Sequence, residues 1–295
     1  MNDKIYRYLE TCLQNEIDND LVLQDVSSLS GGCINAASKL VTNKGLFFAK
    51  WNANCPDDLF LREAESLIEL RKAKTELVIP EVFLALEPKD NQPALLLTEF
   101  IEPASDRSKQ DEKLGIGLAQ LHQFEQKQFG FVHNNYCGAT LQDNSFQEDW
   151  VTFYRDQRLS HLLKMIENKR SIDSHSLKIY NILLDKLPEI IGHQPKPALN
   201  HGDLWSGNYM YSQKGPALID PASAYADREL DLALTTMFGG FSSRFWDAYQ
   251  EYYPLSPDWK DRNNLYMLYH YLNHYYLFGG GYGMQALEIA KSYIS

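Results

Sequence analysis

Three oxygen-bearing side chains at fixed spacing are the residues of this chain best suited to chemistry. Asp203 and Asn208 lie five residues apart in His201-Gly-Asp-Leu-Trp-Ser-Gly-Asn208, and Asp220 follows twelve residues later in Ala217-Leu-Ile-Asp-Pro221. An aspartate on a loop can accept the proton of an attacking hydroxyl, and an asparagine can turn its amide oxygen toward a metal ion. We expect Asp220, after the next strand, to complete a magnesium site for the phosphates of a nucleotide. Asp203 or Asn208 alone could equally stabilise a turn, but the ordered set between apolar runs favours catalysis.

A lysine and a glutamate far from this segment could hold the same phosphates. Lys50 lies near the end of a predicted strand, and Glu63 lies beside the apolar stripe of a predicted helix over residues 57–71. A carboxylate next to a buried seam needs a partner, so we expect Lys50 to pair with Glu63 and to orient the phosphates. Two alternatives stay open. Lys50 could extend to the surface, and Glu65 could be the partner, although it faces elsewhere on the helix.

Two backbone segments complete the predicted nucleotide site. The turn Ser30-Gly-Gly-Cys-Ile-Asn35 could lay backbone N–H groups over phosphates, with Gly31, Gly32, Cys33 and Asn35 as its contacts. Without its context, a Gly-Gly hairpin is more often only a turn. The segment Thr98 to Pro103 is a plausible hinge, because a strand run ends there and the composition becomes polar. Backbone groups of Glu99, Phe100 and Ile101 could bind the adenine edge.

The elements that must position these residues fall into two groups. An N-terminal helix over 3–16 is followed by short strands at 21–23, 36–41 and 46–51, the helix 57–71, and strands at 82–86 and 94–101. Beyond Pro103 the chain is mainly helical, with short strands predicted only around 206–220; the predicted helices span 108–124, 147–168, 174–191, 228–237, 242–252, 258–278 and 284–294. We therefore predict an α+β fold with two lobes. Residues 1–101 form an antiparallel sheet with a helix, and residues 102–295 form the helical lobe with the catalytic loop and substrate pocket.

Composition limits the partners. The 295 residues carry a net charge of −11, from 28 basic and 39 acidic residues, and no run of lysine or arginine exceeds two. Nucleic acid and anionic membrane are therefore unexpected partners. No apolar stretch approaches the length of a membrane span, and the N-terminus is charged from the start. Four cysteines without a C-x-x-C pair fit a reduced compartment and argue against zinc, so we expect a soluble, cytoplasmic protein.

The motifs together resemble one known family, the fructosamine kinases or ketosamine-3-kinases. The resemblance covers nearly the whole chain. The H-G-D triplet alone also fits aminoglycoside phosphotransferases and choline kinases, whereas the Leu-Trp-Ser-Gly extension favours fructosamine kinases. The segments that carry the resemblance are Ser30 to Asn35, Phe129-Gly-Phe131, Trp150 with Phe153, Arg158-Leu159, His201 to Asn208, Ile219 to Ala222, Asp231-Leu-Ala233, Met237-Phe-Gly-Gly-Phe241 and Tyr271-Leu-Asn-His274.

This resemblance implies a protein-kinase-like fold and a reaction. Members of the family use ATP and Mg²⁺ to phosphorylate the third-carbon hydroxyl of ketosamines, the rearranged products of amine glycation. The phosphorylated adduct is unstable, so the amine is freed. On this reading Asp203 accepts the hydroxyl proton, Asn208 and Asp220 hold magnesium, and the Lys50–Glu63 pair orients the phosphates.

Several further residues receive secondary roles. We expect His201 to orient the catalytic loop rather than to contact substrate, and Trp205 either to line the sugar pocket or to belong to the core. Asp227, Arg228, Glu229 and Asp231 are interpreted as capping the next helix and bracing the loop. Family similarity places Asn273 and His274 on the substrate side, although their aromatic-rich helix is typical of a core. The same similarity suggests substrate contacts for Trp150 and Arg158, whose spacing does not place both with Phe153 on one face of an α-helix.

Three hypotheses about function and one about regulation follow. The first function is a ketosamine kinase; the others are an aminoglycoside or choline-type phosphotransferase and a nucleotide-binding regulator without catalysis. Some relatives carry a cysteine at the glycine turn whose oxidation joins two subunits, which implies that this protein is a monomer or a redox-linked homodimer through Cys33. The simpler interpretation is that Cys33 is a small residue filling a turn.

Overall fold

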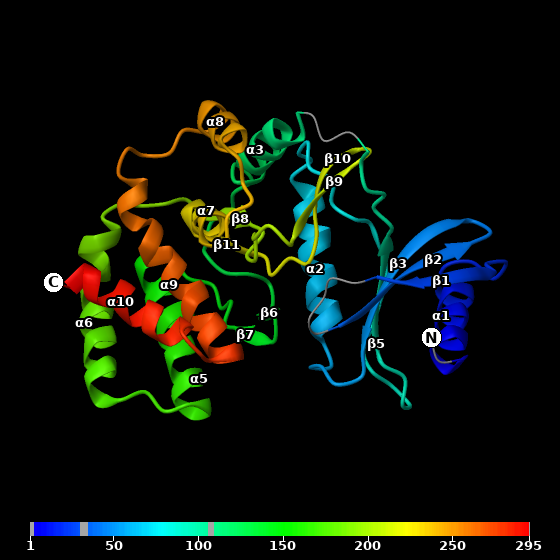
Figure 1. Cartoon of the computed structure of the whole chain (residues 1–295), viewed down its shortest axis with the longest axis horizontal. Helices are drawn as coiled ribbons and strands as arrows, with labels where there is room; N and C mark the ends of the chain where they lie inside the picture. Colours follow the sequence, from blue (N-terminus) through cyan, green and yellow to red (C-terminus); the bar gives the residue numbers. More distant parts are fainter. Residues whose placement is uncertain (1–2, 30–34, 106–108, 295) are drawn as a thin grey trace.

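The chain folds around an antiparallel sheet at its N-terminal end and a group of helices at its C-terminal end (Figure 1). The computed structural model describes residues 3–29, 35–105 and 109–294. Among these, no helix is both long enough and apolar enough to cross a bilayer. The N-terminal part runs in the order α1 (Asp3–Glu16), β1 (Leu23–Ser28), β2 (Ala36–Thr42), β3 (Gly45–Asn52), α2 (Leu59–Lys72), β4 (Val82–Leu86) and β5 (Ala94–Glu99).

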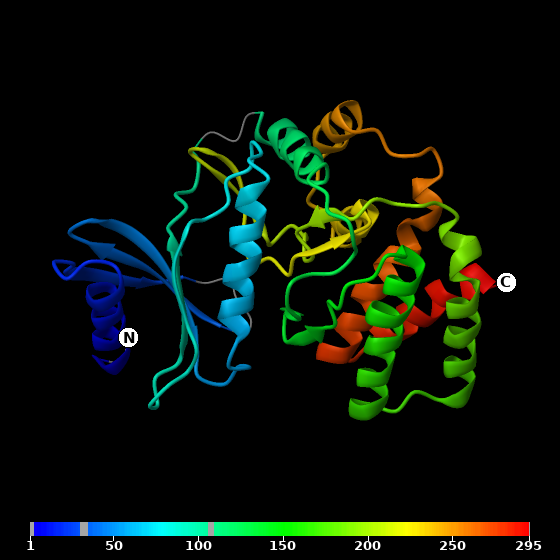
Figure 2. The ribbon, with the colours of Figure 1, turned by 180° about the vertical axis from the view of Figure 1, so that it is seen from behind.

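The sheet is covered by a helix on each face. Its order is β1-β2-β3-β5-β4, and every neighbouring pair is antiparallel. Successive side chains of a strand point to opposite faces, which explains the uninterrupted apolar run of β5. Leu95 and Leu97 pack in the cluster that contains Leu9 and Leu13 of α1. Ala94 and Leu96 pack in the cluster of α2, which lies between the sheet and the rest of the molecule (Figures 1 and 2).

The C-terminal part is mainly helical, as predicted. Its helices are α3 (Gln110–Leu121), α4 (Trp150–Thr152), the π-helix η1 (Phe153–Ser160), α5 (His161–Lys169), α6 (Ser174–Ile191), α7 (Arg228–Met237), α8 (Ser243–Tyr252), α9 (Trp259–Phe278) and α10 (Tyr282–Ile294). Short strands form three two-stranded sheets: β6 (Asn135–Cys137) with β7 (Thr140–Gln142), β8 (Ala198–Asn200) with β11 (Ala224–Ala226), and β9 (Tyr209–Ser212) with β10 (Gly215–Leu218). The fold is therefore the predicted α+β, protein-kinase-like architecture.

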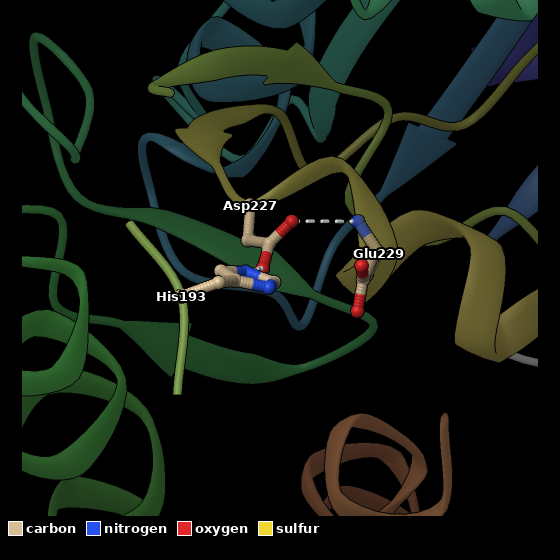
Figure 3. Close-up of side chains that lie close together, drawn as sticks. All are labelled: His193, Asp227 and Glu229. Atoms are coloured by element: carbon tan, nitrogen blue, oxygen red, sulfur yellow. Dashed lines mark hydrogen bonds and ion pairs between the residues drawn. The ribbon is translucent and has the colours of Figure 1, made fainter. Parts of the chain in front are cut away.

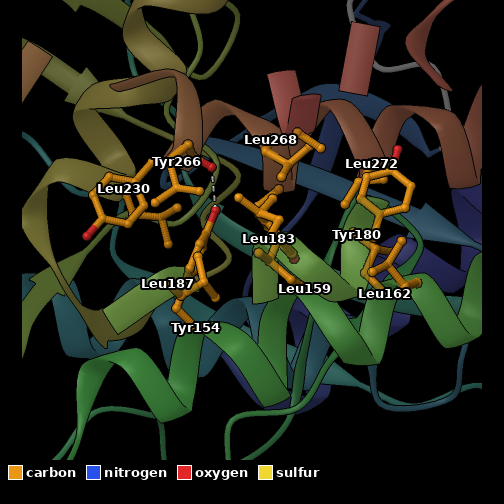
Figure 4. Packing of buried hydrophobic residues seen from close by; sticks show 14 of the residues in the cluster. Tyr154, Leu159, Leu162, Tyr180, Leu183, Leu187, Leu230, Tyr266, Leu268 and Leu272 are labelled. Atoms are coloured by element: carbon orange, nitrogen blue, oxygen red, sulfur yellow. Dashed lines mark hydrogen bonds between the residues drawn. The ribbon is translucent and has the colours of Figure 1, made fainter. Parts of the chain in front are cut away.

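A large core holds these helices together. Leucines and tyrosines of η1, α5, α6 and α9 interdigitate in its centre (Figure 4). The side chains of Tyr154 and Tyr266 are fully buried there, and their polar ends are paired. The Tyr154 hydroxyl donates to the Leu265 carbonyl at 2.7 Å, and the indole N–H of Trp150 donates to the Tyr266 hydroxyl at 2.8 Å. Buried aromatic residues with satisfied polar groups give this part a rigid base for the loops that it carries.

Three predictions about elements need correction. The first strand begins at Leu23 and runs to Ser28, not over 21–23, because Leu21 packs in the core ahead of the strand. The predicted helix 147–168 is divided by the π-helix. The strands β6, β7, β8 and β11 were not predicted, because strands of three residues are too short to show a period. The boundary between residues 101 and 102 falls two residues after β5 and stays a prediction.

Candidate active site

The segment 201–220 is positioned by the ladders that flank it. β8 ends at Asn200, directly before His201, and the β9–β10 hairpin separates Asn208 from Asp220. This hairpin is also attached to the N-terminal part of the chain. The backbone of Val78 exchanges hydrogen bonds with Pro216 and Leu218 at 2.9 and 3.0 Å, and Lys214 pairs with Glu99 at 2.5 Å. The residues after β10 are thereby held next to the sheet that carries Lys50.

Lys50, Glu63 and Asp220 form one charged group, in which Lys50 and Glu63 are largely buried and the Asp220 side chain is partly exposed. The Lys50 ammonium lies 3.0 and 2.9 Å from the two carboxylate oxygens of Glu63 and 3.1 Å from Oδ1 of Asp220. Burial alone would lower the pKa of Lys50, but the two carboxylates raise it, so the ammonium stays charged. Burial raises the pKa of Glu63, and Lys50 opposes that shift. The predicted pairing of Lys50 with Glu63 is present, whereas Glu65 pairs with Arg62 at 2.6 Å.

Asp203 and Asn208 are in direct contact. The Asn208 amide nitrogen donates to the backbone oxygen of Asp203 at 2.8 Å and to its Oδ2 at 3.0 Å. Burial and the nearby charge of Asp220 raise the pKa of Asp203 to about 7. A carboxylate with this pKa can accept a proton near neutral pH, and its repulsion from Asp220 is the kind that a cation relieves.

The donor set fits a magnesium ion. Because the amide nitrogen of Asn208 is used by Asp203, its Oδ1 is the ligand atom left for a metal. Asp220 follows β10 with a positive φ of 55°. An amide oxygen and a carboxylate oxygen, completed by water and phosphate oxygens, are the ligands that Mg²⁺ prefers. Asn208 and Asp220 would therefore hold the ion that the sequence implies.

His201 and Asp231 form hydrogen bonds with the backbone around the catalytic loop. The ring of His201 is fully buried; its Nε2 lies 2.9 Å from the Ile219 carbonyl, and its Nδ1 accepts from the Asp203 backbone N–H at 3.3 Å. Burial lowers the pKa of His201, so the ring is neutral and one nitrogen donates while the other accepts. Asp231 accepts from the backbone N–H groups of His201 and Gly202 at 2.6 and 2.8 Å. His201 and Asp231 therefore contact the backbone of the loop, and the orienting role of His201 stays a prediction.

Gly202 is a position of this loop where the backbone leaves no room for a side chain. Its φ is +86°, and a Cβ atom there would lie 2.0 Å from the carbonyl oxygen of Ala222. The loop thus approaches the segment after Asp220 so closely that only glycine fits.

The predicted nucleotide contacts lie partly outside the described residues. Gly31, Gly32 and Cys33 are not among the described residues, so the glycine turn and the Cys33 hypothesis stay predictions. Asn35 accepts a hydrogen bond from Asn52 at the end of β3, at 2.8 Å.

The hinge residues follow the last strand of the sheet. Glu99 ends β5, the ring of Phe100 lies 4.9 Å from the Lys39 ammonium, and Ile101 is buried. These three residues therefore lead from the sheet into the helical part, where a backbone contact to adenine was expected.

Aromatic side chains form one wall beside Asp203. Trp205 is 39% exposed, so its side chain is accessible and does not belong to the core. Its ring lies 6.2 Å from Phe238, and Phe238 lies 5.3 Å from the ring of His274. Phe278 and Tyr282 continue the series at 5.7 and 5.1 Å from His274. Trp205 and His274 thus lie on one aromatic wall that could receive a substrate.

The other three predicted substrate residues are buried. Trp150 and Arg158 are 1% and 2% exposed and pack with Phe153. The π-helix explains this, because one π-turn spans five residues and brings Phe153 and Arg158 together, with the guanidinium 4.5 Å from the ring centre. Arg158 donates to Asp143 O and Asn144 Oδ1 at 2.6 and 2.7 Å. These positions build the core and leave no surface on which a substrate could lie.

Asn273, the third of these, lies on α9 and is 3% exposed. Its partners are Thr140 and Cys137, two residues that sequence reasoning did not single out. A lone cysteine in a three-residue strand gives no signal in the sequence.

A second cluster of titratable side chains lies at the start of α7. The side chains of His193, Asp227 and Glu229 converge there, with ligand atoms within 4.8 Å of one another (Figure 3). Asp227 accepts from the Tyr266 hydroxyl at 2.7 Å and lies 2.8 Å from His193, and Arg262 donates to both oxygens of Glu229. Because these oxygens already have partners, the cluster is explained as a network that joins α7 to α9. A surface hollow of about 530 Å³ adjoins His193 and includes none of the predicted site residues.

Comparison with known proteins gives consistent matches over most of the chain. The fructosamine kinase family model matches residues 5–295. A probable ketoamine kinase of Vibrio parahaemolyticus is 39% identical over 271 residues, which are 90% of this chain and 91% of that protein. The chloroplastic protein-ribulosamine 3-kinase of Arabidopsis thaliana is 35% identical over 272 residues, 91% of this chain and 82% of that protein.

Solved structures share the fold. The crystal structure of a Haemophilus somnus protein assigned as a fructosamine-3-kinase superimposes with a TM-score of 0.86, at 23% identity and 98% coverage of both chains. A thermostable aminoglycoside phosphotransferase APH(4)-Ia, in a ternary complex with AMP-PNP and hygromycin B, superimposes with a TM-score of 0.65. That structure is 14% identical and covers 96% of this chain and 98% of its own.

Proposed function

The chain belongs to the fructosamine kinase family, and from this we propose that it transfers the γ-phosphoryl group of ATP to the third-carbon hydroxyl of ketosamines. Fructosamine or ribulosamine adducts of lysine or protein amines are the substrates that fit the proposal. The phosphorylated adducts are unstable, so the activity amounts to deglycation. The observation that carries the proposal is the convergence of Lys50, Glu63, Asp203, Asn208 and Asp220 from four separate segments into one site.

The residues divide the work of the transfer. Asp203 accepts the proton of the substrate hydroxyl as the oxygen attacks the γ-phosphorus, and its pKa of about 7 suits that task. Lys50, held by Glu63, orients the phosphates. A magnesium ion on Asn208 and Asp220 would neutralise the charge that develops on the phosphate oxygens.

The remaining residues of the site position Asp203 and the substrate. His201 and Asp231 hold the backbone of the loop, so that Asp203 need not move into place when substrate binds. The wall of Trp205 and His274 offers stacking faces to a sugar and to the carrier of the amine. The AMP-PNP complex of the aminoglycoside phosphotransferase, which shares the fold, supports ATP as the phosphoryl donor.

The test is ADP release with Mg²⁺ and ATP against a panel of acceptors. The panel holds fructosyl-lysine, ribulosyl-lysine, an aminoglycoside and choline, and the control variant is Asp203→Asn. We expect turnover with the ketosamines, a loss of about 10²-fold or more in kcat for Asp203→Asn, and no turnover after chelation of the metal. Turnover with the aminoglycoside alone would replace the proposed acceptor, and ATP binding without any turnover would support a regulator instead.

A further inference from the structure

The loop between Asp203 and Asn208 contains a glycine that its backbone does not require. Gly207 is not among the glycines with a positive φ, whereas Gly202 is. Outside the positive-φ region a side chain adds no backbone strain. The reason for a residue without a side chain at position 207 therefore lies in its surroundings.

The indole ring of Trp205 occupies the space that a side chain at position 207 would need. A Cβ atom on Gly207 would lie 2.2, 2.3 and 2.7 Å from Cη2, Cζ2 and Cζ3 of that ring. Carbon atoms in ordinary contact are about 3.5–4.0 Å apart, so the ring and a side chain cannot both be accommodated. The outer ring of the indole thus lies directly against the Cα atom of Gly207.

A second neighbour limits the indole on another side. The ring of Phe238 meets it edge to face, with ring centres 6.2 Å apart and an angle of 74° between the planes. The segment of Phe238 is itself attached to the residues after the loop, because the Tyr209 hydroxyl donates to the Gly240 carbonyl at 2.7 Å. Gly207 and Phe238 together therefore fix where the partly exposed indole lies in the aromatic wall.

The indole is the part of this arrangement that can move. The Trp205 N–H donates to the Asp203 carbonyl at 3.1 Å, and the Asn208 N–H donates to the Trp205 carbonyl at 3.0 Å, so the backbone before and after Gly207 is hydrogen-bonded. The indole is partly exposed and turns about two side-chain bonds. A methyl group at position 207 would consequently displace the ring and leave the backbone in place.

We propose that Gly207 is a positioning residue for recognition of the phosphoryl acceptor: the absence of its side chain lets the Trp205 indole lie against the loop, where the sugar of the ketosamine stacks on it. The inference rests on the proposed function, in which Trp205 belongs to the wall that receives the substrate. Gly207 acts only through Trp205. A larger residue at position 207 changes the wall that the acceptor meets and leaves the Lys50–Glu63 pair unchanged.

A double-mutant cycle tests the role. In Gly207→Ala we expect KM for the ketosamine to rise about 3-fold to 10-fold, the size of one aromatic contact, while KM for ATP is unchanged. In a Trp205→Ala background the same substitution should have no further effect, because no ring is left to displace. Gly281→Ala is the control, since its Cβ atom would meet nothing within 4 Å. An unchanged KM in Gly207→Ala, or an equal rise in both backgrounds, would overturn the proposal, the latter because the methyl group would then act through the backbone or Asn208.

Fluorine NMR of protein labelled with fluorotryptophan separates this inference from the proposed function. The chain has five tryptophans, and the resonance absent from Trp205→Ala belongs to Trp205. We expect Gly207→Ala to shift this resonance alone. We also expect fructosyl-lysine to shift it in the wild type and to bind about 3-fold to 10-fold more weakly to Gly207→Ala.

Each outcome of this measurement is decisive. A Trp205 resonance that Gly207→Ala does not move, or that fructosyl-lysine does not move, refutes the inference whatever the activity. Fructosyl-lysine that binds at Trp205 without being phosphorylated keeps the inference and rejects the proposed function instead. If Gly207→Ala does not fold, the double variant with Trp205→Ala should fold, because nothing then obstructs the methyl group; failure of both to fold would also overturn the proposal.

Discussion

At the scale of single residues, Glu63 decides whether Lys50 can serve the phosphates. It supplies two of the three oxygens around the ammonium, and the third belongs to Asp220, which the metal would engage. In Glu63→Gln, Lys50 would keep an amide oxygen as an acceptor but would lose the charge of the carboxylate, so Asp220 would draw the ammonium toward the metal site. We expect kcat/KM for ATP to fall about 10-fold to 100-fold, since a hydrogen bond to a charged group contributes about 1.5–3 kcal/mol. Initial rates at varied ATP measure this.

The same helix offers the matched control. Glu65 lies two residues further along α2 and pairs with Arg62 and His133 at the surface. Glu65→Gln should leave kcat/KM for ATP within about twofold of the wild type, because surface ion pairs contribute little. If both variants lose the same activity, the effect belongs to the helix as a whole, and the assigned role of Glu63 would have to be given up.

Residue types and spacing predicted the charged residues of the site but not their arrangement. The pairing of Lys50 with Glu63 agrees with the sequence prediction, because it follows from one face of a helix. The contact of Asn208 with Asp203 was not predicted, although the two residues are only five positions apart. The contact of Lys50 with Asp220 spans 170 residues. It has no local pattern, so it was not predicted.

At the scale of elements, α7 couples the helical core to the catalytic loop. Asp227 caps the helix by accepting from Glu229 N–H at 3.0 Å, and Asp231, one turn later, binds two backbone N–H groups of the loop. His122 of the segment after α3 lies 3.3 Å from Asp231, and the histidine and the loop hold the pKa of Asp231 low although burial alone would raise it. One carboxylate thus joins α3, α7 and the loop.

Asp231→Asn keeps the shape of this side chain and removes one acceptor. In either orientation its amide N–H₂ would face a backbone N–H, that of His201 or that of Gly202, and two donors cannot bond, so the loop should shift. We expect kcat to fall about 10-fold or more and the melting temperature to drop by several degrees, with ADP affinity little changed. Asp247→Asn, at an exposed position of α8, is the control and should change neither quantity. An Asp231→Asn enzyme with wild-type kcat would show that the loop is held by other contacts.

The π-helix η1 was not predicted from the sequence. The helical bounds of α7, α8 and α9 agree with prediction to within a residue or two, because their apolar residues recur at α-helical spacing and because α7 and α8 begin at side-chain caps. In η1 the spacing of five between Phe153 and Arg158 is wrong for an α-helix and right for a π-turn. The sequence contains that spacing, but only the packing around Trp150 selects the rarer helix.

At the scale of the whole molecule, neutral histidines inside the helical core make the folded state sensitive to acid. Burial lowers the pKa of His270, on α9, to about 3, and the ring is 2% exposed. Since the pKa of an unfolded histidine is about 6.5, the unfolded chain binds the proton first. Above pH 6.5 the ring is neutral in both states and does not reduce the free energy of unfolding. As the pH falls from 6.5 toward 3, the free energy of unfolding decreases by about 1.4 kcal/mol per pH unit.

Replacing His270 measures its contribution to the pH dependence of the unfolding free energy. In His270→Phe the ring cannot be protonated in either state, so its unfolding free energy should fall less between pH 7.5 and pH 5, by about 2 kcal/mol, than that of the wild type. Urea unfolding at the two pH values measures the difference, and the comparison between pH values removes any constant packing effect of the new ring. His175→Gln, at an exposed position of α6, should keep the wild-type pH dependence. Equal pH dependence in His270→Phe and the wild type would mean that carboxylates alone govern acid unfolding and that the core tolerates a charged His270.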